Sequence, residues 1–348
     1  MKRLLVTAMS VCLATVTLSE VAAEAPADAG RNADTPRKFV EITPELRAAA
    51  GKGLAYLARA QAEDGSYGYD SYGRHVGITS LACLAFMSDG HMPGRGVYGP
   101  NVEKGLDFVL RHVEETGLIA GDTSHGPMYG HGFATLFLGE IYGMTGDSRL
   151  REALVKAVRL IVTTQNEEGG WRYHAVPFDA DISVTICQIM ALRSARNAGI
   201  SVPKTTIDRA VAYVRNCQNP ADGGFRYMLN SSGSAFPRSA AGVASLYYAG
   251  VYEDNALQRG LDYLIRNRAE IRRGKGHYYY GQYYAVQAMF LAGGRYWRQW
   301  FPDVRQHLIT TQQSDGRWEA KNHGDQYATA MSLIILQMPN RFLPIFQR

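Results

Sequence analysis

The stretch that decides the fold is Gln165–Trp171, which reads QNEEGGW. A glutamine, an acidic residue, a glycine and an aromatic residue follow one another in the same order at Gln61–Tyr67, Gln218–Phe225 and Gln312–Trp318. The four stretches begin at positions 61, 165, 218 and 312, so they are separated by 104, 53 and 94 residues. Two of these separations are close to twice the third. We therefore expect a repeat of about 50 residues with two degenerate copies.

A helical segment precedes each of these turns and reveals the two missing copies. Its signature is a basic residue followed by small and apolar residues, as in KGLAYL at Lys52–Leu57 and KGLDFV at Lys104–Val109. The signature begins at positions 52, 104, 156, 209, 259 and 305, so successive starts differ by 52, 52, 53, 50 and 46 residues. This regular spacing predicts six repeats.

A second helical segment follows each turn and is apolar on most faces, which predicts that it is buried nearly all round. The first helix of each pair carries charged residues on one side, so we expect it to be half-exposed. Six such pairs indicate an inner and an outer ring, and a closed ring needs no polar caps at its ends. The sequence therefore predicts an all-α (α/α)6 toroid over residues 40–348. The buried helices are expected near Gly77–Ser88, Gly132–Met144, Asp181–Asn197, Ser239–Gly250, Gln282–Ala292 and Tyr327–Met338.

The composition agrees with a globular fold. Hydrophobic residues make up 46% of the 348 residues and charged residues 20%, which excludes a disordered chain. The 36 glycines have no three-residue period, which excludes collagen. The net charge is +5 and no long basic run is present, so no nucleic-acid partner is expected.

The N-terminal segment has the pattern of a secretory signal peptide. Lys2 and Arg3 precede a largely apolar stretch, Leu4–Leu18, which is too short to span a bilayer. The small residues at Val21–Ala23 then suit a cleavage site. We expect a signal peptide at 1–23, a flexible lead-in at 24–39 and a secreted or periplasmic protein with no integral membrane domain. An uncleaved membrane anchor is the alternative.

The turn motif resembles the repeat motif of squalene and hopene cyclases and of protein prenyltransferase β subunits. The whole chain after residue 23 is similar to secreted bacterial, planctomycete-type prenyltransferase and squalene oxidase repeat proteins. The resemblance implies the α/α-toroid superfamily of terpenoid cyclases and protein prenyltransferases. It is specific for the fold and says little about the activity, because function resides in sites carried by folds.

Triterpene cyclases carry an Asp-x-Asp-Asp motif whose middle aspartate protonates the substrate. The nearest match is Asp179–Ile182, and the resemblance implies that Asp181 is the acid. Ile182 replaces the last aspartate, and the chain is about half as long as a two-domain cyclase, so squalene-type cyclisation is doubtful. Asp181 is alternatively a helix N-cap, with its carboxylate on early backbone N–H groups.

The other chemistries of the superfamily lack their residues. Protein prenyltransferases hold zinc with Asp, Cys and His, but Gly281 stands where the histidine is expected and no Asp-x-Cys pair is present. A thioester requires a cysteine that the stretch Gly130–Phe133 lacks. We therefore expect no metal and no cofactor. Cys83 and Cys187 lie in apolar helical stretches and are interpreted as buried small hydrophobes. One disulfide plus a free thiol among Cys83, Cys187 and Cys217 is the alternative.

Polar and aromatic residues gather where the inner helices begin, so they are expected to meet at the mouth of a central cavity. Partial positive helix dipoles also point there and favour an anionic ligand. Asp181 and His131 are the candidate acid–base pair, and Arg238 is the candidate electrostatic clamp. Tyrosines near residue 280 are expected to line a wall for a sugar or isoprenoid. The further candidate ligand-binding residues are Asp179, Tyr129, His277, Tyr280, Gln282, Tyr283 and Asp325.

Two functions remain open. The first is an enzyme with its active site at the cavity mouth, a lyase, hydrolase or cyclase acting on a glycan or isoprenoid. A glycan suits the expected secreted compartment better. The second is a non-catalytic binding or scaffold protein of the cell envelope that has lost the catalytic motifs of the superfamily. The C-terminal segment Gln337–Phe346 is apolar and is expected to plug the ring or dock elsewhere.

Overall fold

A computed structural model describes residues 39–68, 73–121, 126–273 and 276–347. These residues fall within one compact unit, Val40–Arg348, apart from Phe39. The predicted signal peptide and nearly all of the lead-in lie outside the described residues. Among those described, helices dominate and only isolated β-bridges occur, so the predicted all-α class is confirmed. None of the described helices is long and apolar enough to cross a membrane.

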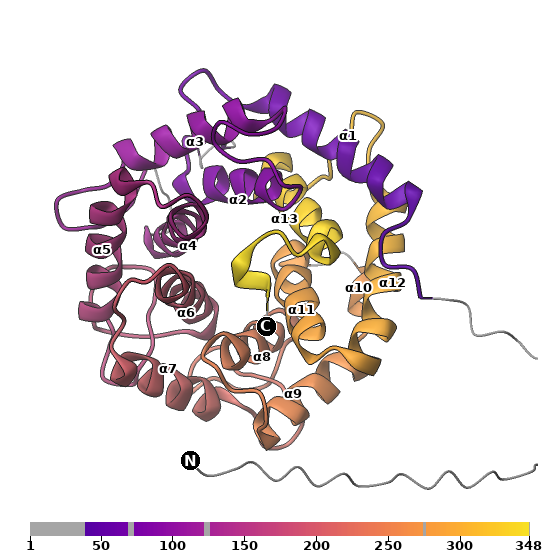
Figure 1. The fold of residues 1–348 in the computed structure, drawn as a ribbon. Coiled ribbons are helices and arrows are strands. Elements are labelled where there is room, and N and C mark those ends of the chain that lie inside the picture. Colours follow the sequence, from indigo (N-terminus) through magenta and orange to yellow (C-terminus); the bar gives the residue numbers. More distant parts are fainter. Residues whose placement is uncertain (1–38, 69–72, 122–125, 274–275, 348) are drawn as a thin grey trace, which may run out of the picture. The chain divides into compact units, whose positions relative to one another are not determined.

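The predicted inner and outer rings are confirmed (Figure 1). Neighbouring inner helices pack on one another all the way round, and the last inner helix packs on the first. The inner helices are α2 (Val76–Met87), α4 (Met128–Thr145), α6 (Ile182–Asn197), α8 (Phe236–Tyr248), α11 (Tyr278–Ala292) and α13 (Asp325–Gln337). The outer helices are α1 (Pro44–Ala60), α3 (Gly99–Arg111), α5 (Ser148–Thr163), α7 (Lys204–Cys217), α9 (Asn255–Arg266) and α12 (Gly294–Thr311).

The glutamine that recurs in four of the turns joins one repeat to the next. The side-chain amide of Gln165 donates to the carbonyl of Gly169 in its own turn at 2.8 Å and to the carbonyl of Thr206 in α7 at 2.9 Å. In the last repeat, Gln312 donates to the carbonyl of Ala49 in α1 and so closes the ring. The same bridge is made by Gln61 to Asn101 and by Gln218 to Ala256.

The glycine of each turn allows the closest contact between repeats. Gly169 has a φ of +99°, and a Cβ there would lie 2.3 Å from the carbonyl oxygen of Arg209 in α7. Only glycine combines that backbone conformation with that approach. The basic residue of the helix signature therefore supplies the carbonyl against which the preceding turn packs. The equivalent pairs are Gly65 with Lys104, Gly117 with Lys156, Gly223 with Arg259 and Gly316 with Lys52.

The aromatic residue of the turn holds the two helices of one repeat together. The indole N–H of Trp171 donates to the carbonyl of Ile161 in α5 at 2.7 Å. Its backbone N–H donates to the hydroxyl of Thr185 in α6 at 3.1 Å. Trp171 is almost completely buried, so the ring fills space between the layers while its polar atom is paired.

The two degenerate copies are confirmed as helix pairs, α3 with α4 and α9 with α11. The first keeps the turn glycine, Gly117. In the second, a short helix, α10 (Glu270–Arg273), stands in the connection. The described part of that connection contacts α12 through an ion pair, with Arg268 at 2.6 Å from Asp303.

The C-terminal segment closes the end of the ring at which the inner helices finish. It forms two short 3-10 helices, η2 (Met338–Asn340) and η3 (Pro344–Phe346), and crosses over the inner helices in Figure 1. Ile345 is buried, and its N–H donates to the carboxylate of Glu140 in α4 at 3.0 Å. The other carboxylate oxygen accepts from Ser194 of α6 at 2.7 Å. Burial raises the pKa of Glu140 to about 7.

We expect alanine at Gly169 to destabilise the protein more than alanine at Gly199. Both glycines have positive φ, so both changes carry a backbone cost of about 1–2 kcal/mol. A Cβ at Gly199 meets nothing within 4 Å, whereas at Gly169 it collides with the Arg209 carbonyl. The collision adds about 1–3 kcal/mol. Urea unfolding of both variants measures the difference, and equal losses would contradict a role for the contact.

Glu140→Gln is expected to remove a pH dependence of stability. Because the pKa of Glu140 is raised on folding, the folded state binds more protons between pH 4.5 and about 7, and stability falls as pH rises through that window. The loss amounts to about 3 kcal/mol. The variant should therefore be the more stable protein at pH 8 and differ little at pH 4. Urea unfolding across this range, with exposed Glu152→Gln as control, tests it; an unchanged pH profile in Glu140→Gln would refute it.

Candidate functional site

The inner helices begin at the end of the ring opposite to the C-terminal segment, and we call this end the mouth. Three of them meet there around Ser183 in the first turn of α6. The hydroxyl of Tyr129 from α4 lies 2.7 Å from the hydroxyl of Ser183. The hydroxyl of Tyr280 from α11 donates to the Ser183 carbonyl at 2.9 Å. The structure thus brings two of the predicted tyrosines together from different helices.

Asp181 is the N-cap of α6, so the N-cap interpretation is confirmed. Its Oδ1 accepts from the backbone N–H groups of Ser183 and Val184 at 2.8 and 2.9 Å and from the Ser183 hydroxyl at 2.5 Å. Its Oδ2 accepts from the hydroxyl of Tyr227 at 3.1 Å. The residue is completely buried, and this burial raises its pKa although the hydrogen bonds oppose the rise. The role of Asp181 as an acid stays a prediction.

Asp179 lies beside it in a different environment. It is partly exposed and forms a close ion pair with Arg172. The guanidinium of Arg172 also lies over the ring of Tyr173 at 4.9 Å and over the ring of Tyr227 at 5.8 Å. Two carboxylates therefore stand at one helix start. Asp179 is closely paired with Arg172, whereas Asp181 is buried among hydroxyls with the Arg172 Nε at 3.5 Å.

Tyrosines fill the centre of the ring below the mouth. Tyr283 and Tyr284 of α11 are fully buried, and their rings lie 4.8 Å apart. The Tyr284 hydroxyl reaches across to the thiol of Cys187 in α6 at 3.3 Å. Gln282 is also buried, and its amide has no hydrogen-bond partner. Because Tyr283, Tyr284 and Gln282 are completely buried, the ring is packed with side chains below the mouth.

The remaining candidates stand apart from Asp181. His277 is exposed before α11 and stacks on His323, with ring centres 5.8 Å apart. Asp325 lies 3.1 Å from Arg317. Arg238 donates to the carbonyl of Gly233 in its own loop at 3.3 Å rather than to a mouth carboxylate.

His131 does not reach the mouth. Its Nδ1 accepts from the backbone N–H of Ile119 at 3.1 Å, and the fully buried ring lies beside Ala157 of outer helix α5. In other repeats a hydroxyl fills this place, for example that of Thr185. Burial lowers the pKa of His131 to about 4, so the imidazole is neutral. The structure therefore does not pair His131 with Asp181.

Sequence reasoning missed Arg172, Tyr173, Tyr227 and Ser183. A signal for three of them was present. Trp171 and Phe225 each end a turn motif, and each is followed directly by Arg-Tyr. Comparing the residues after each turn, rather than only the turn itself, finds this repeated pair. No such signal marks Ser183, because it belongs to the site only through its position in the first turn of α6.

No metal centre is evident: the described residues contain no group of three or more His, Cys, Asp and Glu side chains that could hold an ion. Cys83, Cys187 and Cys217 are free and buried. A cavity of about 580 Å³ adjoins the rim of the mouth between the first and last repeats, beside Arg74 and Gln326.

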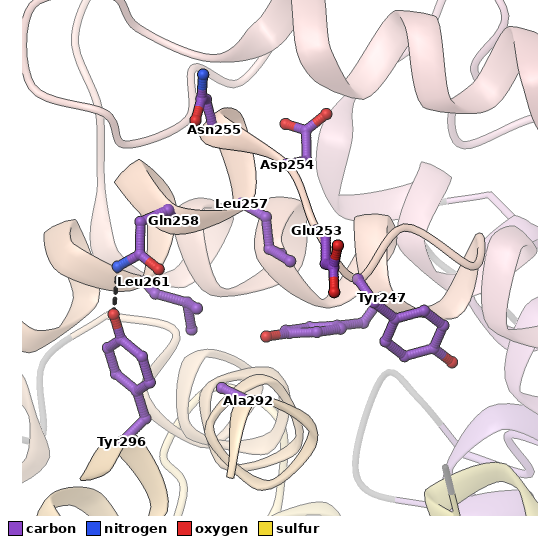
Figure 2. A pocket seen from close by; sticks show the side chains of 10 residues that line it. Tyr247, Glu253, Asp254, Asn255, Leu257, Gln258, Leu261, Ala292 and Tyr296 are labelled. Carbon is purple, nitrogen blue, oxygen red and sulfur yellow. Dashed lines mark hydrogen bonds between the residues drawn. The ribbon is translucent and has the colours of Figure 1, made fainter. Parts of the chain in front are cut away.

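A larger cavity, of about 700 Å³, lies away from the mouth, between the α8–α9 connection and the ends of α11 and α12 (Figure 2). Gln258 and Tyr296 are hydrogen-bonded at its edge. Asp254 caps α9 and pairs with Arg215 at 2.6 Å. These side chains are already engaged in a hydrogen bond, an ion pair and a helix N-cap that hold the fold together. The mouth, in contrast, brings Asp181 and hydroxyls from several repeats together, and we place the candidate site there.

No protein-family model and no curated protein sequence matches this chain. Solved structures do match, over nearly their whole length. An α-1,6-mannanase of Salegentibacter sp. has a TM-score of 0.63 at 10% identity, covering 84% of this chain and 98% of that one. The type II terpene cyclase MstE from Scytonema has 0.61 at 13%, covering 86% and 99%. A cellobiose 2-epimerase from Bacillus thermoamylovorans has 0.65 at 13%, covering 85% and 98%. At such identities these matches show the α/α-toroid fold alone.

We expect His131→Ala to destabilise the protein by about 1–3 kcal/mol, because it leaves the buried N–H of Ile119 without an acceptor. His131→Thr supplies the hydroxyl that other repeats use and should recover much of that loss. Thermal and urea unfolding of the two variants give the comparison. If His131→Thr folds like the parent yet abolishes a measured activity, His131 belongs to the chemistry after all.

Proposed function

We propose that this protein is a carbohydrate-processing enzyme of the α/α-toroid fold that binds a glycan at the mouth. The observation that carries the proposal is Asp181, a buried carboxyl with a raised pKa and hydrogen-bonded hydroxyls between it and the mouth. A carboxyl group whose pKa is moved toward neutrality by burial is suited to general acid–base catalysis.

The shape of the site favours a glycan over an isoprenoid. Cyclisation of an isoprenoid needs a long enclosed apolar chamber. In the described part of this ring, Tyr283 and Tyr284 fill the centre and the C-terminal segment covers the far end. What remains is a mouth edged by phenol rings, carboxylates and Arg172. Aromatic faces combined with a few polar groups that fix orientation suit a sugar.

The structural neighbours are compatible with this choice. The mannanase has been solved with α-1,6-mannotriose and the terpene cyclase with geranylgeranyl dihydroxybenzoate. The third neighbour is an epimerase of cellobiose by name. The basic and apolar start of the chain supports export, and a glycan outside the cytoplasm fits that location. Whether the reaction is hydrolysis, elimination or epimerisation is to be read from the product.

The proposal is tested by incubating the purified protein with neutral and acidic oligosaccharides and analysing the products by mass spectrometry and by NMR, because epimerisation leaves the mass unchanged. We expect turnover of a glycan and a fall of at least about 100-fold in kcat for Asp181→Asn. Asparagine caps helices as well as aspartate does, so this variant should fold normally. Asp208→Asn, on the exposed face of α7, is the matched control.

Two results would contradict the proposal. Full activity in Asp181→Asn would remove Asp181 from the chemistry. Glycan binding without turnover, measured by calorimetry, would favour the non-catalytic binding protein instead.

A further inference from the structure

The two oxygens of the Asp181 carboxyl have different surroundings. Oδ1 accepts three hydrogen bonds, two of them from backbone N–H groups of α6. Oδ2 accepts one, from Tyr227 at 3.1 Å, with Nε of Arg172 further away at 3.5 Å. Because the backbone cannot reverse its donors, Oδ1 remains an acceptor in either protonation state. Oδ2 is the oxygen at which a proton can be held.

Because Oδ1 always accepts, the chain of hydrogen bonds that runs from Oδ1 through Ser183 to Tyr129 has a fixed direction. Ser183 must donate its hydroxyl proton to Oδ1, so it can only accept from Tyr129. Tyr129 therefore donates inward to Ser183, and its oxygen can only accept from a ligand. We call Oδ1, Ser183 and Tyr129 the fixed arm.

The chain of hydrogen bonds that runs from Oδ2 through Tyr227 to Tyr173 has no fixed direction. Tyr227 lies between Oδ2 and the hydroxyl of Tyr173, with which it forms a close contact. Every member of this second chain is a hydroxyl or carboxyl group that both donates and accepts, so its direction reverses when Asp181 gains a proton. We call Oδ2, Tyr227 and Tyr173 the exchange arm.

Both arms end side by side at the mouth. Asp181 is fully buried, whereas Tyr129 and Tyr173 are partly exposed. Their ring centres lie 6.0 Å apart. Arg172 is held over the rings of Tyr173 and Tyr227, which fixes the exchange arm in place.

We infer that Asp181 exchanges its proton with the ligand through Tyr227 and Tyr173, while Tyr129 receives a ligand hydroxyl as a fixed acceptor. The inference rests on the proposed function for the ligand and on the contacts above for the path. Tyr173 and Tyr129 are then the groups that touch the ligand. Ser183 is a positioning residue, since it acts only by fixing the polarity of Tyr129.

The transfer balances without another reagent. When the site acts as a base, a ligand proton moves to the Tyr173 oxygen, the Tyr173 proton moves to the Tyr227 oxygen, and the Tyr227 proton moves to Oδ2. Asp181 becomes neutral and the ligand takes its negative charge. When the site acts as an acid, the same three transfers run in reverse. Each O–H bond that breaks along the arm is replaced by one that forms.

The charged and titratable groups around Asp181 are consistent with this path. Arg172 is the neighbouring cation, and it is already ion-paired with Asp179. The other titratable neighbours are hydroxyls and thiols whose pKa values burial raises, so they are neutral at ordinary pH. They come from α4, α6, α7, α11 and the turn before α8, and are Tyr129, Cys187, Tyr213, Cys217, Tyr280 and Tyr227.

The path is tested first in the protein without ligand, by infrared spectroscopy across a pH titration. The carbonyl band of protonated Asp181 is assigned as the band that Asp181→Asn removes. We expect Tyr227→Phe to shift both the frequency and the titration midpoint of this band, because Oδ2 loses its hydroxyl partner. Tyr129→Phe should leave the midpoint unchanged, since Ser183 still donates to Oδ1. Exposed Tyr252→Phe is the control. Equal shifts for Tyr129→Phe and Tyr227→Phe would overturn the two-arm assignment.

Kinetics on a turned-over glycan then separate the two arms. Tyr173→Phe and Tyr227→Phe should each lower kcat by about 100-fold and change the pH profile. Tyr129→Phe should raise KM and leave kcat nearly unchanged. An unchanged kcat in Tyr173→Phe would overturn the exchange arm. The infrared measurement needs no substrate, so it tests the hydrogen-bond path by itself. The absence of any glycan turnover would therefore contradict the proposed function and not the path.

Discussion

The structure depends on a contact between a turn glycine and a backbone carbonyl of the next outer helix. The glycine brings the turn within reach, and the glutamine of the same turn bonds to both sides of the junction. Because this contact recurs around the ring, neighbouring repeats pack on one another in the same way. The bond from Gln312 to Ala49 joins the last repeat to the first and closes the ring. Among the described residues, five of the 36 glycines of the chain make this contact.

The same geometry determines where chemistry can occur. All inner helices start at one end, so side chains at their N-caps converge although they are distant in sequence. Asp181 shows the double use of such a position. Its Oδ1 caps α6, as an aspartate at a helix start normally does. Its Oδ2 does not cap the helix and accepts instead from the hydroxyl of Tyr227. On the proposed path, a structural role and a chemical one are thus divided between two oxygens of one side chain.

Sequence periodicity predicted the helix pairs, their order and the ring, because each depends on local spacing and on which faces are apolar. The site was predicted less completely. Asp181, Asp179, Tyr129 and Tyr280 were identified and lie together, since each stands at the start of an inner helix or just before one. His131 was misplaced because a histidine near a helix start resembles a catalytic one until its direction is known. The sequence also could not show that the ring centre is filled, because only packing places Tyr283 and Tyr284 there.

One junction of the ring is unlike the others. Between the fifth and sixth repeats, no described turn glycine packs on a carbonyl of α12. The contacts there are made by side chains, namely the half-exposed ion pair of Arg268 and Asp303 and the hydrogen bonds of Tyr296 with Gln258 and Asp262. Dissolved salt weakens such a pair, whereas it leaves a glycine packed on a carbonyl unaffected. This junction therefore lacks the backbone contact that the α7–α9 junction keeps beside its own ion pair, Arg215 with Asp254. We expect high ionic strength to weaken it more than its neighbours. The short helix α10 lies at this junction and is followed in the chain by α11, so the side of the ring that carries Tyr280 lacks the described glycine-to-carbonyl contact of the other junctions.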